Sequence, residues 1–343
     1  MFISLMALLA KTNTDLILLA AGERASSNIT YLTGAQLTHA GVCITKAGAR
    51  LYVSPLDYGK KSKIPITVQK KPLLDTLKKY HSKRIGLEFN ATSIVQIKNL
   101  KKAFPRAKFI DIGPTLEKIR AIKTTDELEL MAKAAQIANQ SYKKIIDHFD
   151  YRTESDIKAA LEYEMAKRGA SPAFPTIVAS GSNASIPHHA TSSAKLNNGL
   201  CIIDFGANYH GYCSDCTRTV SIGTPTRIQK KLYATVLNAQ LSAITQVTPE
   251  KNCADIDKTA RTALGKLNKY FIHSLGHGIG IDVHETPNIS AKSKDILKKN
   301  NVITIEPGIY IPRKLGIRIE DTLVVGNKPN ILTNLAKELF VVK

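Results

Sequence analysis

The sequence predicts an α/β (α+β) protein with two domains, residues 1–118 and 119–343. Three observations predict this fold class. The chain has 343 residues, which is more than most single domains contain. Its first third alternates short helical and strand patterns. The remainder repeats one order of elements, a pair of helices followed by a hairpin, which indicates two similar halves with a site between them.

The first domain is predicted to be a compact α/β unit. Its opening segment, MFISLMALLAK, is read as an ordinary first helix and not as a signal peptide, because it has no basic start and no clear cleavage site. Strand patterns occupy Asp15–Ala21, Ala40–Thr45, Arg50–Ser54, Arg84–Glu88 and Phe109–Ile112, and helical patterns occupy Leu73–Tyr80 and Ser93–Ala103. A domain boundary is expected near residues 119–123.

The second domain opens with two capping-box spacings. Thr124 precedes Glu127 by three residues, and Thr153 precedes Asp156 by three, so two helices are expected to run to about Phe149 and Gly169. The remaining elements are helices over Arg227–Val247 and Ala254–Leu267, a hairpin over Cys201–Val220, and strands over Asn301–Glu306 and Gly316–Val325.

The chain is strongly basic, with 48 Lys and Arg against 28 Asp and Glu and a net charge of +20. The excess is concentrated in residues 1–120, which hold 20 basic and 7 acidic residues. Such a surface can bind nucleic acid or another acidic partner. We interpret it instead as a solvated lysine-rich face, because aromatic residues are not interleaved with the lysines and no nucleic-acid motif is present.

Cysteine content and hydropathy bear on the compartment. There are five cysteines, and Cys213 and Cys216 form a CxxC around Asp215. No second CxxC exists, so these two are interpreted as strand residues and not as a zinc knuckle or a redox pair. A reducing cytoplasm is therefore expected. No run of about 18 apolar residues occurs, so no membrane span is expected.

Each hairpin of the second domain carries two acidic residues. If partner numbers sum to 419 in the first hairpin, Asp204 lies opposite Asp215, and if they sum to 626 in the second, Glu306 lies opposite Glu320. The two glutamates interrupt runs of Ile and Val that are typical of buried strands. Buried carboxylates that face each other repel, and each costs several kcal/mol unless a cation lies between them. Four of them in one place predict a metal site.

Four carboxylates and one neutral imidazole suit two divalent ions, since the charges balance. Hard oxygen ligands with one His favour Mn, Co, Fe or Zn, and two ions about 3.5–4 Å apart would activate a bridging water and polarise a carbonyl. The candidate imidazoles are His273, His277 and His284. Glycines surround them, so this stretch is expected to be extended chain. HExxH is absent, which excludes a zincin-type site.

The segments DFGANYHGYCSDCTRT, HSLGHGIGIDVHETP, ITIEPGIY and GIRIEDT resemble the metal-binding signature of the pita-bread metallopeptidases (M24), in the branch of Xaa-Pro dipeptidase (prolidase) and Xaa-Pro aminopeptidase. The resemblance covers the chain from about Ile119 to its end. A weaker similarity, through NITYLTG (28–34) and LYVSPLDY, links residues 1–118 to the creatinase-like N-terminal domain of that branch. It implies a pita-bread catalytic domain with pseudo-twofold halves around an antiparallel sheet.

The resemblance also implies roles for particular residues. Asp204 would bind one ion, Asp215 and Glu320 would bridge two ions, and His277 and Glu306 would complete the second, with Mn or Co as the most typical metals. Glu306 would also carry the proton from the attacking bridging hydroxide to the leaving nitrogen. His188 and His284 would line the substrate site and stabilise the tetrahedral intermediate, and His273 and Arg318 match positions behind the ligands or beside the substrate. His189 has no counterpart and is treated as incidental.

The implied activity is metal-dependent hydrolysis of Xaa-Pro bonds in dipeptides or short peptides, by a protein that is typically a homodimer. Methionine aminopeptidase is the nearest enzyme alternative, but it usually lacks the N-terminal domain and carries Gln at the position of Arg318. Creatinase shares both domains but lacks the metal ligands. A non-catalytic pita-bread protein that binds partners through its basic surface is the alternative from another class, supported only by the net charge.

Overall fold

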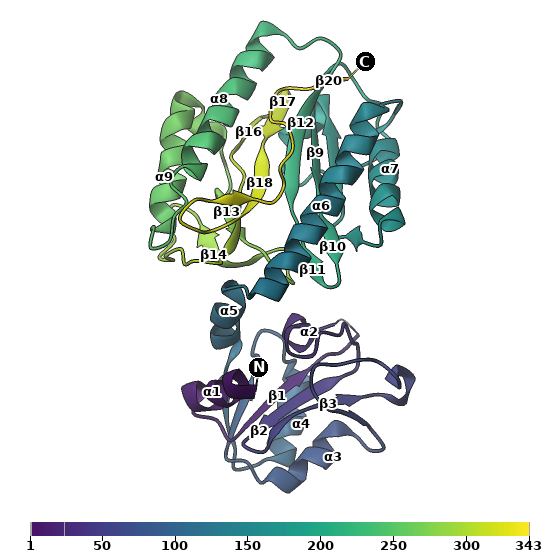
Figure 1. Cartoon of the computed structure of the whole chain (residues 1–343), viewed down its shortest axis with the longest axis vertical. Helices are drawn as coiled ribbons and strands as arrows, with labels where there is room; N and C mark the ends of the chain where they lie inside the picture. The colour runs from purple at the N-terminus through teal and green to yellow at the C-terminus, as the bar shows by residue number, and fades with distance from the viewer. Residues whose placement is uncertain (1, 24, 343) are drawn as a thin grey trace. The chain divides into compact units, whose positions relative to one another are not determined.

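The computed structural model describes residues 2–23 and 25–342. The chain divides into two compact units, Met1–Arg120 and Ala121–Lys343, and each is described by itself (Figure 1). No helix within the described ranges combines the length and the apolar character needed to cross a membrane.

The first unit is built on a mixed six-stranded sheet with the order β4-β3-β2-β1-β5-β6. Neighbours β1, β2 and β3 are antiparallel, whereas β4, β5 and β6 join their neighbours in parallel. The strands are β1 (Leu16–Ala20), β2 (Gly41–Thr45), β3 (Gly48–Val53), β4 (Ile66–Val68), β5 (Arg84–Leu87) and β6 (Lys108–Asp111). All five predicted strands are confirmed, and β4 is the strand that the sequence patterns missed.

Helices cover both faces of this sheet. They are α1 (Phe2–Thr12), α2 (Ser27–Thr33), α3 (Leu73–Leu77), α4 (Ile94–Ala103) and α5 (Gly113–Ala121). Alternate residues of β1 face opposite sides: Ile17 and Leu19 pack with α1, α2 and α5, and Leu16 and Leu18 pack with α3 and α4. The predicted helices at α1, α3 and α4 are confirmed, whereas α2 and α5 were not predicted.

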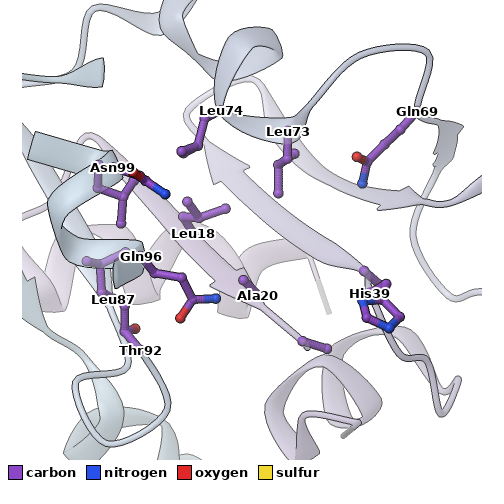
Figure 2. A pocket seen from close by; sticks show the side chains of 13 residues that line it. Leu18, Ala20, His39, Gln69, Leu73, Leu74, Leu87, Thr92, Gln96 and Asn99 are labelled. Atoms are coloured by element: carbon purple, nitrogen blue, oxygen red, sulfur yellow. The ribbon is translucent and has the colours of Figure 1, made fainter. Parts of the chain in front are cut away.

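A cavity of about 290 Å³ opens beside α3 and α4 in this unit. Figure 2 shows Leu18 and Ala20 of β1 with Leu73 of α3 and Asn99 of α4 around it. None of the residues singled out as site candidates lines this cavity.

The second unit contains four long helices, α6 (Thr125–Asp147), α7 (Glu154–Lys167), α8 (Arg227–Ile244) and α9 (Cys253–Leu264). Both predicted capping boxes are present: the Thr124 and Thr153 side chains accept from the backbone N–H groups of Glu127 and Asp156, whose carboxylates accept in return. Each box satisfies two N–H groups that a helix start would otherwise leave unpaired. All four predicted helices are confirmed within a few residues.

A large sheet lies between the helix pairs (Figure 1). Its order is β14-β13-β15-β18-β12-β9-β8, with β19 beside β18 and β20 beside β12. The strands are β8 (Ile177–Ser180), β9 (Gly199–Phe205), β12 (Cys216–Ile222), β13 (Gly276–Gly278), β14 (Glu285–Ile289), β15 (Val302–Ile305), β18 (Glu320–Val324), β19 (Asn330–Ile331) and β20 (Val341–Val342). Helices α6 and α7 share a core with β8 and β9, and α8 and α9 share a core with β15 and β18.

Two smaller sheets flank the large one. They consist of β7 (Ser171–Pro172), β10 (Ala207–Tyr209) and β11 (Tyr212–Cys213), and of β16 (Gly308–Ile311) with β17 (Leu315–Arg318). The helix pair and hairpin thus occur twice around the central neighbours β12 and β18, as the repeated pattern in the sequence predicted.

The registers of the two hairpins differ in how well they were predicted. In the second hairpin, Ile305 pairs with Asp321 and Gly308 with Arg318, so the predicted sum of 626 is confirmed. In the first, Asp204 pairs with Thr217, so the sum is 421, and the prediction that Asp204 lies opposite Asp215 is wrong.

The turn explains this shift in the first hairpin. A type I′ hairpin turn, whose twist matches that of the strands, needs positive φ at both central residues. His210 and Gly211 adopt φ 49° and 89°, and Tyr209 pairs with Tyr212 around them. The turn is therefore centred one residue later than expected, which raises every pair sum by two.

Candidate functional site

Strand pairing places acidic side chains in a row across the large sheet. Asp204 of β9 lies opposite Thr217 of β12, and Thr217 lies opposite Glu320 of β18. Continuing the confirmed register past Ile305 brings Glu306 opposite Glu320. Directly opposed residues project from the same face of a sheet, so these three carboxylates share one surface.

Asp215 lies on the same surface and immediately precedes β12, which begins at Cys216. It precedes Thr217 by two residues and therefore points to the same side. The backbone of Ser214 approaches Gly206 so closely that a Cβ at Gly206 would lie 1.9 Å from the Ser214 oxygen. Asp204 and Asp215 are consequently diagonal neighbours, although they are not directly paired.

Three of the predicted ligands already form a compact donor set. One possible ligand atom from each of Asp215, His277 and Glu320 lies within 4.8 Å of the others. His277 Nε2 lies 3.7 Å from Asp215 Oδ2 and 3.4 Å from Glu306 Oε1. Asp204 lies at the edge of this set, where its carboxylate accepts a hydrogen bond from Arg318 Nη2.

The electrostatics of this cluster show a shortage of positive charge. Burial, and then repulsion from Glu320, raises the pKa of Asp215 well above its ordinary value. The same two causes raise the pKa of Glu306. Burial, followed by repulsion from Asp204, raises the pKa of Glu320 to about 8. Each carboxylate therefore resists ionisation, first because it is buried and then because its neighbours repel its charge.

The residues present fit a divalent metal ion. Asp215 Oδ1 is buried and has no hydrogen-bond partner in the structure. Buried polar atoms are nearly always paired. The partner of this oxygen must therefore come from outside the protein chain. Carboxylate oxygens with one imidazole nitrogen form the donor chemistry of Mn, Co, Fe or Zn sites.

His277 is held in the form that can bind a metal. Its Nδ1 lies 3.0 Å from the Gly278 carbonyl oxygen, which accepts from the ring and leaves Nε2 without a proton on the carboxylate side. Burial, and then the neighbouring His284, lowers the pKa of His277 to about 4. The ring is therefore neutral at neutral pH.

The glycines beside His277 allow the backbone to approach its neighbours, as the sequence predicted. A Cβ at Gly276 would lie 2.0 Å from the Thr304 oxygen, and one at Gly278 would lie 2.2 Å from the Thr286 oxygen. Residues 276–278 are extended as β13, as predicted, whereas residues 280–284, which include His284, form a bend before β14 and not the extended chain that was expected.

The other candidate side chains border the donor set. The ring of His284 lies 4.4 Å from that of His277. His273 Nε2 lies 3.0 Å from the Tyr310 hydroxyl, which accepts a 2.7 Å hydrogen bond from Arg318 Nη1. Burial, and then the charge of Arg318, lowers the pKa of His273 to about 4, with a smaller effect from the exposed His188. Contacts thus join eight of the nine candidates, and His188 follows Pro187, whose backbone oxygen lies 3.3 Å from Arg318 Nη1.

Sequence reasoning missed several polar residues that touch the candidates, among them Thr217, Thr304 and Tyr310. Thr217 Oγ1 donates a 2.7 Å hydrogen bond to Glu320 Oε2 and accepts one of 3.1 Å from Arg318 Nε. Tyr310 connects His273 with Arg318. The signal for Thr217 was its position two residues after Asp215, which places both on one strand face.

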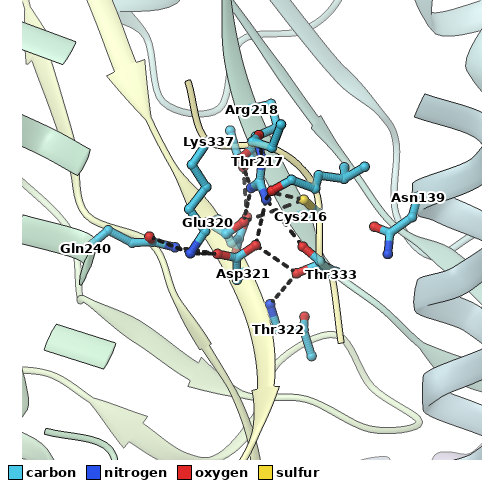
Figure 3. A network of polar contacts seen from close by, with 12 residues as sticks. Asn139, Cys216, Thr217, Arg218, Gln240, Glu320, Asp321, Thr322, Thr333 and Lys337 are labelled. Carbon is cyan, nitrogen blue, oxygen red and sulfur yellow. Dashed lines mark hydrogen bonds and ion pairs between the residues drawn. The ribbon is translucent and has the colours of Figure 1, made fainter. Parts of the chain in front are cut away.

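A second polar network lies on the reverse face of the same central strands (Figure 3). The buried Asp321 accepts hydrogen bonds from Arg218 Nη2 at 2.7 Å and Gln240 Nε2 at 2.7 Å, and Lys337 Nζ lies 2.6 Å from its carboxylate. Arg218 Nη1 donates to the backbone oxygen of Glu320 at 2.6 Å. Arg218 follows Thr217 and Asp321 follows Glu320, so both point to the face of the sheet opposite the donor set. Their hydrogen bonds hold β12 and β18 together on that face.

The cysteines take no part in the donor set. Cys43, Cys201, Cys213, Cys216 and Cys253 are buried and free. Cys213 and Cys216 lie in β11 and β12, as predicted for strand residues.

Comparison with known proteins gives matches along nearly the whole chain. The model of metallopeptidase family M24 matches residues 129–327, and the creatinase/prolidase N-terminal domain matches residues 4–122. The Xaa-Pro dipeptidase of Pyrococcus furiosus is 37% identical over 325 residues, covering 91% of this chain and 92% of that protein. The Xaa-Pro dipeptidase of Pyrococcus horikoshii is 36% identical over 342 residues, covering 96% of this chain and 95% of that protein.

Solved structures are similar in the same way. The X-Pro aminopeptidase from Thermotoga maritima MSB8 superimposes with a TM-score of 0.91 at 32% identity, covering 98% of this chain and 100% of that one. The prolidase from Pyrococcus horikoshii OT3 gives a TM-score of 0.90 at 34% identity, covering 98% of each chain.

Proposed function

Because this chain belongs to metallopeptidase family M24, we propose that it is a metal-dependent peptidase that cleaves the bond between an N-terminal residue and proline. The observation that carries the proposal is the buried donor set of Asp215, His277 and Glu320 at the centre of the large sheet. A bound cation would pair with the Asp215 oxygen that has no hydrogen-bond partner. It would also offset the repulsion between the carboxylates.

We assign two divalent ions to five residues. Asp204 would hold one ion, His277 and Glu306 would hold the other, and Asp215 and Glu320 would contact both. Mn and Co are our first candidates, with Fe and Zn as alternatives, since the donors are oxygens and one imidazole. When bound, the ions would lower the pKa of a water molecule and polarise the scissile carbonyl.

Glu306 is proposed to move the proton. Its side chain is 16% exposed, against 12% for Asp204 and 7% for Asp215, so it is the most accessible of these three carboxylates. It can therefore take a proton from the attacking water and give it to the departing proline nitrogen. Any amide nitrogen must gain a proton as the C–N bond breaks, so cleavage requires such a donor; the Xaa-Pro nitrogen, which has no N–H, then leaves as the secondary amine of proline.

Histidines at the rim of the donor set are proposed to bind the substrate. His188 and His284 are both exposed, and the ring of His284 lies 4.4 Å from that of His277. Both are proposed to donate hydrogen bonds to the oxyanion that develops on the carbonyl. His273 and Arg318, linked through Tyr310, are proposed to orient the substrate and the ligand Asp204.

The substrates are proposed to be short proline-containing peptides. Relatives that cover most of the chain include both Xaa-Pro dipeptidases and an X-Pro aminopeptidase, so dipeptides and longer peptides are both candidates. We further propose a homodimer in a reducing compartment such as the cytoplasm, where five free buried thiols remain reduced.

The test is hydrolysis by protein that has been dialysed against a chelator and then supplied with Mn²⁺ or Co²⁺. We expect metal-dependent release of the N-terminal residue from Xaa-Pro or Xaa-Pro-Yaa peptides, with no comparable cleavage of Met-Ala-Yaa. Product analysis on the two proline substrates separates a dipeptidase from an aminopeptidase. Absence of metal-dependent hydrolysis of every Xaa-Pro peptide would overturn the proposal.

A further inference from the structure

A buried carboxylate outside the metal set organises the loop that carries His188. Glu154 is the first residue of α7 and is 0% exposed. It accepts hydrogen bonds from the loop of residues 180–192, which come from Ser180 N at 2.9 Å, Asn183 Nδ2 at 2.9 Å, His189 Nε2 at 2.8 Å and Ser192 Oγ at 3.3 Å. One side chain therefore binds both ends of this loop.

Glu154 is ionised in this setting. Burial opposes its charge, but hydrogen bonds from Asn183, Ser180 and His189 outweigh burial and hold the pKa of Glu154 below its ordinary value. An ionised carboxylate only accepts hydrogen bonds. His189 must therefore donate from Nε2, which fixes the direction of its ring.

The other side of the loop is held against β17. Arg318 Nη1 donates a 3.3 Å hydrogen bond to the Pro187 oxygen. The loop backbone also packs directly on Gly316, where a Cβ would lie 1.8 Å from the Ala184 oxygen. His188 thus lies between two anchored neighbours, Pro187 on the side of the donor set and His189 on the side of Glu154.

We propose that His189, through its hydrogen bond to Glu154, is a positioning residue that fixes the His188 side chain at the substrate. The inference rests on the proposed function, and it assigns a role to a histidine that the sequence pattern left unexplained. His188 is exposed, so its own surroundings restrain it little. Its position is therefore set by the backbone on either side.

Two amide substitutions of His189 test the role, since they differ only in reach. The amide nitrogen of His189→Gln can replace Nε2 at the Glu154 carboxylate, whereas that of His189→Asn is one methylene too short. We expect H189N to lower kcat and kcat/KM on an Xaa-Pro peptide together by about 10–100-fold, because misplacement of a group by about 1 Å costs a rate factor of that order. We expect H189Q to remain within about threefold of wild type.

A double-mutant cycle separates positioning from general stability. Once His188→Ala has removed the group that is positioned, adding H189N should cost no further activity. Metal content should be the same in all four proteins, because no ligand lies in this loop. Arg168→Leu is the matched control, since it removes an ion pair from the opposite end of α7, roughly 20 Å away.

The outcomes are distinct. Wild-type rates in H189N, equal losses in H189N and H189Q, or a full additional loss when H189N is combined with H188A would each overturn the positioning role. If wild-type protein has no metal-dependent activity, the proposed function itself fails.

Discussion

Thr217 lies directly opposite Glu320 on the two central strands, and its hydroxyl donates a 2.7 Å hydrogen bond to the Glu320 carboxylate. The same hydroxyl accepts from Arg318 Nε at 3.1 Å. One small side chain therefore orients a proposed bridging ligand and an arginine that also binds Asp204. Removing a group that orients a metal ligand in this way typically lowers metal affinity by about 10–100-fold.

Replacing Thr217 with Val keeps the shape and removes the hydroxyl. We expect the affinity for Mn²⁺ to fall about 10–100-fold, because Glu320 loses its orienting donor. Titration calorimetry on chelator-treated protein measures this. Thr235→Val is the control, since the Thr235 hydroxyl bonds only the Lys231 oxygen within α8. An unchanged affinity in T217V would contradict the orienting role.

Replacing Asp215 with Asn should abolish metal binding while keeping the fold. The substitution replaces a buried carboxyl group, which is costly to ionise beside its neighbours, with a neutral amide, so the metal-free protein should unfold at the same temperature as wild type or higher. Addition of Mn²⁺ should stabilise wild type but not D215N. Differential scanning calorimetry with and without metal checks both statements, with the exposed Asp147→Asn as control. A metal-dependent increase in the unfolding temperature of D215N would refute the assignment.

The stability of the metal-free protein should fall as pH rises. Burial and mutual repulsion raise the pKa values of Asp215, Glu306 and Glu320 above those in the unfolded chain. Protonated carboxylates therefore contribute stability that is fully present below about pH 4. This contribution is lost as pH rises through the folded-state pKa values, of which that of Glu320 is about 8.

Metal binding should show the opposite trend, because ions bind the deprotonated ligands and release protons. We expect the gain in unfolding temperature on adding Mn²⁺ to grow from about pH 5 to about pH 9. Thermal unfolding across this range measures both curves, and D215N should give a shallower metal-free slope. A metal-free wild type that becomes more stable relative to D215N with rising pH would be the contrary result.

Removing Lys123 should destabilise the second unit. Its ammonium lies 3.0 Å from Glu285 Oε2, and the two side chains are only 1% and 7% exposed. Glu285 also accepts from the backbone N–H of Ile281, in the loop that leads to His284. Removing one partner of a buried ion pair loses the attraction while the remaining charge stays out of water, so Lys123→Met should lower the free energy of unfolding by about 3–5 kcal/mol.

Urea denaturation monitored by circular dichroism gives the comparison for this pair. Lys158→Met is the matched control, because its partner Glu162 lies 3.9 Å away and both side chains are about one-third exposed. A surface pair of this kind contributes less than about 1 kcal/mol. Equal losses in the free energy of unfolding of the two variants would show that the buried Lys123 pair contributes no more than a surface pair.

Local sequence patterns predicted the elements that local chemistry decides. The capping boxes at Thr124 and Thr153 specify helix starts through contacts three residues apart, and they occur as predicted. Short or edge elements were missed: β4 has three half-buried residues and pairs only at the sheet edge, and α2 has only seven residues, although Ser26 caps its start and Gly34 its end. The register of the first hairpin was wrong because it depends on which two residues adopt positive φ, and here one of them is His210, not a glycine.

The sequence by itself determined which residues could bind a metal, because Asp, Glu and His recur there at points where buried strands would exclude charge, and it determined the family through those motifs. Only the tertiary structure decided that β12 pairs with β18, which sets Asp204, Thr217 and Glu320 in one row. It also decided that Glu154 and His189 meet across 35 residues of chain. Neither contact has a local signal, because each depends on how distant segments pack rather than on backbone preferences within a few residues.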